Sequence, residues 1–92
     1  MDDTPFTILL IEDNRLQIDI VRDTLQKAPG HRFTLHTAES LHEGLELISD
    51  TAIDAVLLDL NLPDSEGVDT LRAMLAASPG LAVVVLTAVD DE

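Results

Sequence analysis

The sequence predicts one α/β domain, residues 1–92, in which a mostly parallel sheet carries helices on both faces. Apolar runs and segments of helical periodicity alternate in the order β-α-β-α-β-α-β. The apolar side chains are almost all Leu, Val, Ile and Ala, with two Phe and no Trp or Tyr, which suits a parallel sheet covered by helices. With 92 residues, 46% of them hydrophobic, the chain can bury one small core.

The first third of the chain predicts a strand, a helix and a second strand. Residues 8–11 form a continuous apolar run, which is typical of a strand buried on both faces. Residues 16–25 carry an apolar stripe at helical spacing, and the sequence APG at 28–30 ends the helix. The stripe consists of Leu16, Ile20, Val21, Thr24 and Leu25. Residues 32–36 alternate polar and apolar side chains, as a half-exposed strand does.

The middle of the chain predicts a second helix and a third strand. Ser40 and Glu43 have the spacing of a capping box, which marks the start of a helix. The apolar face of this helix is predicted to be Leu41, Leu45 and Ile48. Residues 55–59 are an apolar run that ends in Asp59, and they predict another strand buried on both faces.

The last third predicts one more helix and one more strand. Asp64 or Ser65 is expected to cap the helix, and the sequence SPG at 78–80 ends it. The predicted apolar stripe of this helix is Val68, Leu71 and Leu75. Residues 81–86 form a fourth apolar strand.

The strand patterns also predict the strand order 2-1-3-4. The alternating second strand belongs at an edge, and the continuously apolar first and third strands belong inside the sheet. The order then reverses between the first and third strands, and ligands of such sheets bind at the carboxyl ends of the strands beside that point. The fourth strand is equally apolar, although no later residue remains to cover its outer side. We therefore expect either a fragment of a larger domain or pairing with another chain at this edge.

Three carboxylates are predicted to meet at this point of the sheet. Glu12 and Asp13 follow the first strand, and Asp59 ends the third. At about 5 Å and an effective dielectric near 20, each pair of charges repels by roughly 3 kcal/mol, so the arrangement favours a divalent cation among them. Two simpler interpretations stay open: Glu12 and Asp13 could cap the following helix, and Asp59 could start an ordinary turn.

Charge and composition exclude several classes of function. The net charge of −13 makes nucleic acid and anionic membranes poor partners. The chain has no Cys, which rules out disulfides and thiolate metal sites. No apolar run approaches the roughly 20 residues of a membrane span, and the acidic N-terminus has no signal-peptide pattern. We therefore expect a cytoplasmic protein.

Three segments of the chain resemble the receiver domain of bacterial two-component response regulators. They are ILLIEDN at 8–14, VLLDLNLPD at 56–64 with Gly67, and VVVLTA at 83–88. The resemblance implies a flavodoxin-like, three-layer fold with strand order 2-1-3-4-5, of which the fifth strand and the last two helices are missing here. It also implies that the chain accepts a phosphoryl group from a sensor histidine kinase or a phosphotransfer protein and is not itself an enzyme.

The resemblance assigns roles to particular residues. Asp59 would be the phosphoacceptor. Asp13 and Asp59 would bind Mg²⁺ directly, Glu12 would bind it through water, and the main-chain carbonyl of Asn61 would be a further ligand. Carboxylate and carbonyl oxygens are the ligands that Mg²⁺ prefers.

Further implied roles concern the phosphoryl group itself. Thr87 would be the switch hydroxyl that moves toward it, and the amides of Leu60 and Ala88 would donate hydrogen bonds to it. The family also has a Lys at the end of the fifth strand, whereas the only Lys here is Lys27 in the predicted first helix. An inactive chain therefore stays an alternative.

Two other functions remain open. The chain could be a non-catalytic interaction module that forms a homodimer through the edge of the fourth strand. It could also be a phosphatase of the haloacid-dehalogenase type, which uses an Asp nucleophile after a strand. Such enzymes have a second Asp two residues later, where this chain has Asn61, and their nucleophile usually follows the first strand rather than the third.

Overall fold

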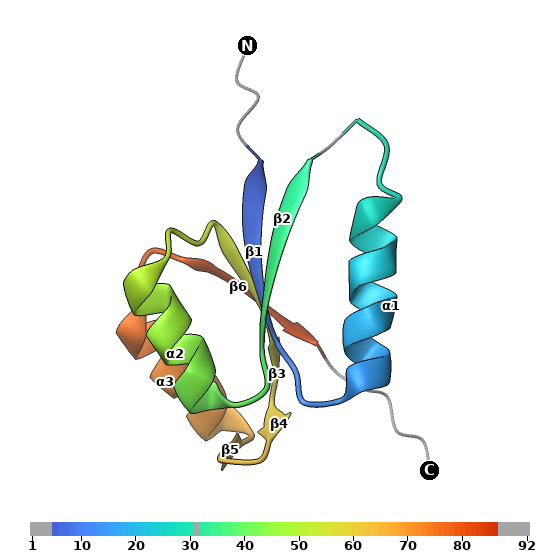
Figure 1. The fold of residues 1–92 in the computed structure, drawn as a ribbon. Coiled ribbons are helices and arrows are strands. Elements are labelled where there is room, and N and C mark those ends of the chain that lie inside the picture. Colours follow the sequence, from blue (N-terminus) through green and yellow to red (C-terminus); the bar gives the residue numbers. More distant parts are fainter. Residues whose placement is uncertain (1–4, 31, 87–92) are drawn as a thin grey trace.

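A four-stranded parallel sheet forms the middle layer of the molecule (Figure 1). The structure is a computed structural model, and it describes residues 5–30 and 32–86. The strands of the sheet are β1 (Phe6–Ile11), β2 (Phe33–Ala38), β3 (Ala55–Asp59) and β6 (Ala82–Leu86). Their order is β2-β1-β3-β6 and every neighbouring pair is parallel, so the predicted order 2-1-3-4 is confirmed.

In the part of the chain that the structure describes, three helices cover the two faces of this sheet. Helix α1 (Arg15–Gln26) lies on one side, whereas α2 (Leu41–Asp50) and α3 (Val68–Ala77) lie on the other (Figure 1). The sequence did not predict the small antiparallel sheet made by β4 (Asn61–Leu62) and β5 (Ser65–Glu66), which lies between β3 and α3 in the chain. Among the described residues, no helix is both long enough and apolar enough to span a membrane.

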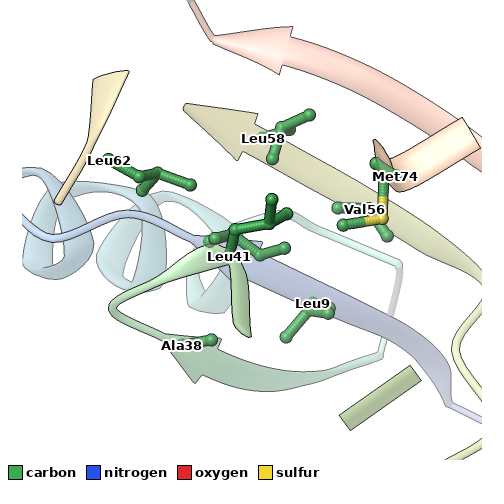
Figure 2. Close-up of a cluster of buried hydrophobic side chains, with 8 residues drawn as sticks. Leu9, Ala38, Leu41, Val56, Leu58, Leu62 and Met74 are labelled. Carbon is green, nitrogen blue, oxygen red and sulfur yellow. The ribbon is translucent and has the colours of Figure 1, made fainter. Parts of the chain in front are cut away.

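The main core lies between the sheet and the α2–α3 layer (Figure 2). Alternate residues of the two central strands supply its centre, because successive side chains of a strand point to opposite faces. Its buried members are Leu9, Ile11, Ala38, Leu41, Val56, Leu58, Leu62 and Met74. Leu45 and Ile48 pack against this cluster, which confirms the apolar face predicted for the second helix.

The predicted faces of the other two helices are partly wrong. In α1 the buried residue is Ile18, while Leu16 is 66% and Ile20 is 50% exposed. In α3 the fully buried residues are Thr70 and Met74, and of the predicted stripe Val68 and Leu75 are exposed while Leu71 packs against the core. Thr70 can be buried because its hydroxyl shares a 2.6 Å hydrogen bond with Ser65 Oγ.

The helix starts agree with the sequence in one case and differ in another. Ser40 caps α2, since its Oγ accepts a hydrogen bond from the amide of Glu43 at 3.1 Å. Neither Asp64 nor Ser65 caps α3, whose N-cap is Gly67 with no side-chain cap. Gly67 has φ 65°, a value that favours glycine. Asp64 instead binds the start of α2.

Candidate functional site

The carboxyl ends of β1 and β3 bring three acidic side chains together. Glu12 and Asp13 follow β1, and Asp59 is the last residue of β3. Ile11 pairs with Leu58 in the parallel register, which puts the next residue of each strand at the same edge. One carboxylate oxygen from each of the three residues lies within 4.8 Å of the other two.

Glu12 is the most buried member of this group. It is only 7% exposed, and its Oε1 accepts a 3.2 Å hydrogen bond from the amide of Asn14. Burial raises the pKa of Glu12 to about 7, and the side-chain hydrogen bond with Asp59 and the charges of Asp59 and Asp13 act in the same direction. Burial and the neighbouring acids therefore disfavour the charge on Glu12, and in the absence of a cation Glu12 is mainly protonated only below about pH 7.

The other two carboxylates are more open to solvent. Asp13 is exposed, and Asp59 is half-buried with its Oδ1 accepting a 3.0 Å hydrogen bond from the amide of Asn61. The group thus offers oxygen ligands only, at close range, with one side open to water. These features fit Mg²⁺, which takes oxygen ligands and retains several waters.

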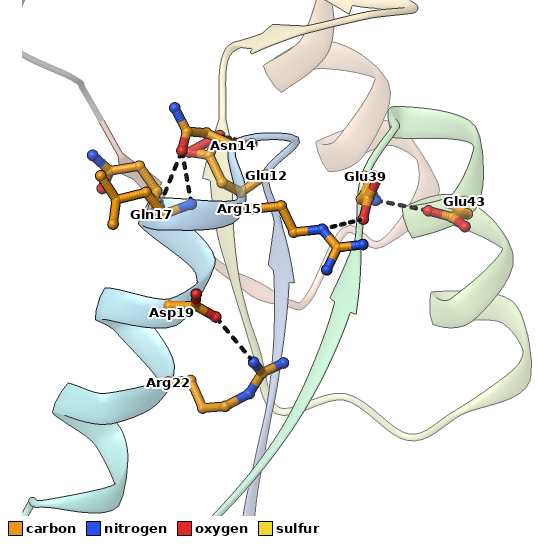
Figure 3. Close-up of polar contacts among 9 residues, drawn as sticks. Glu12, Asn14, Arg15, Gln17, Asp19, Arg22, Glu39 and Glu43 are labelled. Atoms are coloured by element: carbon orange, nitrogen blue, oxygen red, sulfur yellow. Dashed lines mark hydrogen bonds and ion pairs between the residues drawn. The ribbon is translucent and has the colours of Figure 1, made fainter.

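The helix that follows β1 is capped by Asn14, which Figure 3 shows, and not by these acids. Asn14 caps α1, because its Oδ1 accepts hydrogen bonds from the amides of Leu16 at 2.9 Å and Gln17 at 3.2 Å. The interpretation of Glu12 and Asp13 as the cap of this helix is therefore wrong. Both carboxyl groups remain available to the site.

Backbone hydrogen bonds fix the segment that follows Asp59. The carbonyl of Leu60 accepts a 2.6 Å hydrogen bond from the amide of Gly67. Asn61 pairs with Glu66 in the β4–β5 ladder and lies two residues beyond Asp59. Thr87 and Ala88, the predicted switch hydroxyl and amide donor, lie outside the described residues. Leu86, the last residue of β6, pairs with Asp59 in the register.

A second group of polar contacts joins the loops near the site (Figure 3). Arg15 Nε lies 3.7 Å from Glu39 Oε2, and the amide of Glu39 donates to Glu43 Oε1 at 2.7 Å. The capping-box spacing of Ser40 and Glu43 predicts that both side chains bond backbone amides at the start of α2, and both do. No sequence pattern predicts the bonds from Asp64 to α2, because its partners are 22 and 23 residues away.

Comparison with known proteins gives a consistent result. Residues 8–92 match the family model described as the response regulator receiver domain. The chain is 30% identical over 87 residues to the nitrate/nitrite response regulator protein NarP of Escherichia coli, covering 95% of this chain and 40% of NarP. It is 34% identical over 80 residues to the cell cycle transcriptional regulator CtrA of Caulobacter vibrioides, covering 87% of this chain and 33% of CtrA. The chain thus spans well under half the length of these relatives.

Solved structures resemble the fold closely. The MaeR response regulator bound to beryllium trifluoride superimposes with a TM-score of 0.80 at 27% identity, covering 94% of this chain and 70% of MaeR. A response regulator receiver domain protein (CheY-like) from Methanospirillum hungatei gives a TM-score of 0.72 at 26% identity, covering 89% of this chain and 63% of that one.

Proposed function

Since the chain belongs to the response regulator receiver domain family, we propose that it accepts a phosphoryl group on Asp59 in a site that binds Mg²⁺. Receiver domains of this family interact with histidine kinases or phosphotransfer proteins, and the proposed donor is a phosphohistidine of such a partner. The observation that carries the proposal is the gathering of Glu12, Asp13 and Asp59 within 4.8 Å at the carboxyl ends of β1 and β3. The site residues all belong to the single domain proposed for residues 1–92.

The proposed reaction is a nucleophilic substitution at phosphorus. A carboxylate oxygen of Asp59 attacks the phosphorus of the phosphohistidine, and the P–N bond breaks. The imidazole nitrogen leaves with the bonding electrons and takes up a proton, while Asp59 becomes an acyl phosphate. Asp59 suits this role because it is half-buried at a strand end. The amide of Asn61 orients the carboxylate by donating a hydrogen bond to Oδ1.

The remaining residues bind and neutralise charge. Mg²⁺ held by Asp13, Asp59, the carbonyl of Asn61 and, through water, Glu12 would neutralise the phosphoryl oxygens, which is most of what catalysis of phosphoryl transfer requires. The raised pKa of Glu12 supports a cation here, because a divalent charge offsets the burial and repulsion that raise it.

Three more residues complete the proposed phosphoryl site. The amides of Leu60 and Ala88 donate hydrogen bonds to phosphoryl oxygens, and the Thr87 hydroxyl moves toward the group once it is attached. Both kinds of donor stabilise the charge of the acyl phosphate.

Intact-mass measurement tests this function directly. Incubation with acetyl phosphate and Mg²⁺ should add one phosphoryl group to the wild-type chain and to Asp50→Ala, a control at an exposed acid on α2. Asp59→Ala and omission of Mg²⁺ should each abolish the addition. A phosphoryl group that persists in Asp59→Ala contradicts the proposal, as does a wild-type chain that takes up none.

The edge of β6 favours a second candidate, a non-catalytic interaction module. Within residues 5–30 and 32–86, β6 pairs only with β3, and Val84 in its centre is 51% exposed. Such an edge can pair with a second copy of the chain. Light scattering at high concentration separates the cases: a dimer supports this candidate, and a clean 10.0 kDa monomer counts against it.

A further inference from the structure

Asp64 joins the segment after Asp59 to a helix that is distant in the sequence. It lies in the turn between β4 and β5. Its Oδ1 accepts a hydrogen bond from the amide of Leu41 at 2.8 Å, and its Oδ2 accepts one from the amide of His42 at 3.0 Å. The bonds from His42 and Leu41 hold the pKa of Asp64 below its ordinary value. One carboxylate therefore binds the first two amides of α2.

The start of α2 does not need Asp64 for ordinary capping. Ser40 already supplies the local cap through the amide of Glu43. The first amides of any helix lack partners within the helix, and a side chain from another part of the chain is one way to satisfy them. Ser40 and Asp64 thus have different roles at the same helix end: the bond of Ser40 is local, whereas Asp64 comes from another part of the chain.

A short series of backbone contacts leads from Asp59 to Asp64. The amide of Asn61 donates to Asp59 Oδ1 at 3.0 Å. Asn61 then pairs with Glu66, and Leu62 with Ser65, in the β4–β5 ladder. Leu62 is 7% exposed and belongs to the main core. The hairpin between Asp59 and Asp64 is therefore braced by paired backbone and by a buried side chain, so it can transmit a displacement.

Two other contacts join the site to the segment before α2. The amide of Glu12 donates a 2.9 Å hydrogen bond to the carbonyl of Ala38, at the end of β2. Arg15 forms an ion pair with Glu39, and the two side chains are 84% and 56% exposed. Exposed ion pairs contribute little to stability because solvent screens them. The carboxylate of Asp64 differs from both of these contacts, because it bonds the first two amides of α2 itself.

We propose that Asp64 is a positioning residue that couples the cation and phosphoryl site at Asp59 to the first turn of α2. The inference rests on the proposed function, because it requires Mg²⁺ to bind beside Asp59 and Asn61. Coupling of this kind is reciprocal: Mg²⁺ binding should order the first turn of α2, and the tether from α2 should strengthen Mg²⁺ binding.

Calorimetric titration with Mg²⁺ tests the coupling with a matched control. Asp64→Ala removes the tether and should weaken Mg²⁺ binding by about fivefold or more, a typical size for coupling between sites. Ser40→Ala removes the local cap at the same helix end and should leave Mg²⁺ affinity within about twofold, since the Ser40 hydroxyl bonds the amide of Glu43 within the helix. Asp64→Asn retains one acceptor oxygen and should give an intermediate affinity.

Hydrogen exchange supplies a readout at the two bonded amides themselves, compared with and without Mg²⁺ in the same variant. Mg²⁺ should slow exchange at the amides of Leu41 and His42 in the wild-type chain and in Ser40→Ala, but not in Asp64→Ala. Circular dichroism verifies that each variant is folded. If Asp64→Ala does not fold, the same comparison is made with Asp64→Asn. Equal Mg²⁺ affinity in wild type and Asp64→Ala, or equal loss in Asp64→Ala and Ser40→Ala, overturns the coupling while the proposed function stands. A wild-type chain that binds no Mg²⁺ refutes both.

Discussion

At the scale of single residues, Glu12 ties the charge of the site to the stability of the chain. Its pKa rises from 4.5 to about 7 on folding, chiefly because the side chain is buried. Between these two values the folded chain holds a proton that the unfolded chain has lost. The free energy of unfolding must then fall as the pH rises through this window.

The first prediction concerns this pH dependence. In the absence of metal, stability from Glu12 should be fully present below about pH 4.5, and it should be lost as the pH rises to about 7. Urea unfolding between pH 4.5 and pH 8 measures the slope. Glu12→Gln should remove it, whereas Glu66→Gln, a change at an exposed residue of β5, should preserve it. An unchanged slope in Glu12→Gln would show that another group causes the dependence.

A second prediction concerns Asp13 and Mg²⁺. Mg²⁺ should raise the melting temperature of the wild-type chain at pH 8, because it binds only the folded state; at 100 times its dissociation constant the gain is about 2.7 kcal/mol. Asp13→Asn should remove most of this gain. The same variant should be more stable than wild type without metal, because one of three mutually repelling charges is gone. Differential scanning calorimetry with and without Mg²⁺ measures both effects, and an equal Mg²⁺ gain in the two proteins contradicts the prediction.

The acidic residues themselves could be predicted from the sequence, since each stands at the end of an apolar run. Two parallel strands that neighbour each other must place such residues at one edge. The contacts of Asp64 could not be predicted, because Leu41 and His42 are more than twenty residues away and no local spacing marks them. The roles proposed for Thr87 and Ala88 stay predictions.

At the scale of elements, helix faces were harder to predict than helix positions. Hydrophobicity predicts an apolar stripe on α3 that includes Val68 and Leu75, whereas packing buries Thr70 and Met74 and leaves Val68 and Leu75 exposed. Thr70 satisfies its hydroxyl with Ser65, a contact that hydrophobicity alone does not reveal. Strands buried on both faces are easier to predict, because every residue of a continuous apolar run is expected to be buried.

The third prediction concerns the contact between α2 and β1. Gly44 is buried in α2, and a Cβ at this position would overlap Cδ1 of Ile11, with Cγ1 of Ile11 only 2.9 Å away. Ile11 is 0% exposed and has little room to move. Gly44→Ala should therefore destabilise the chain by about 1–3 kcal/mol, although Ala favours helices.

Urea denaturation measures this cost against a matched control. Gly80→Ala adds the same methyl group where nothing lies within 4 Å, so it should change stability by less than about 0.5 kcal/mol. If Gly44→Ala were as stable as Gly80→Ala, the close packing of α2 on β1 would be wrong.

At the scale of the whole molecule, the two faces of the sheet are covered unequally. Within residues 5–30 and 32–86, α2, α3 and the main core lie on one face, and α1 is the helix on the other (Figure 1). Leu16 and Ile20 of α1 and Val84 of β6 are each at least half exposed. The edge position of β2 could be predicted because its polar and apolar residues alternate. The run of β6 is as apolar as those of the central strands although β6 lies at an edge of the described sheet, so its pattern alone does not reveal its place.

The central claim is that one cation binds among carboxylates from separate parts of the chain. A crystal structure of the chain grown with Mn²⁺, which prefers the same oxygen ligands as Mg²⁺, tests it most directly. The account predicts an anomalous peak with Asp13 and Asp59 oxygens about 2.0–2.3 Å away and Glu12 beside them. The account is contradicted if the peak lies elsewhere. It is also contradicted if no peak appears although Glu12, Asp13 and Asp59 still lie within 4.8 Å of one another.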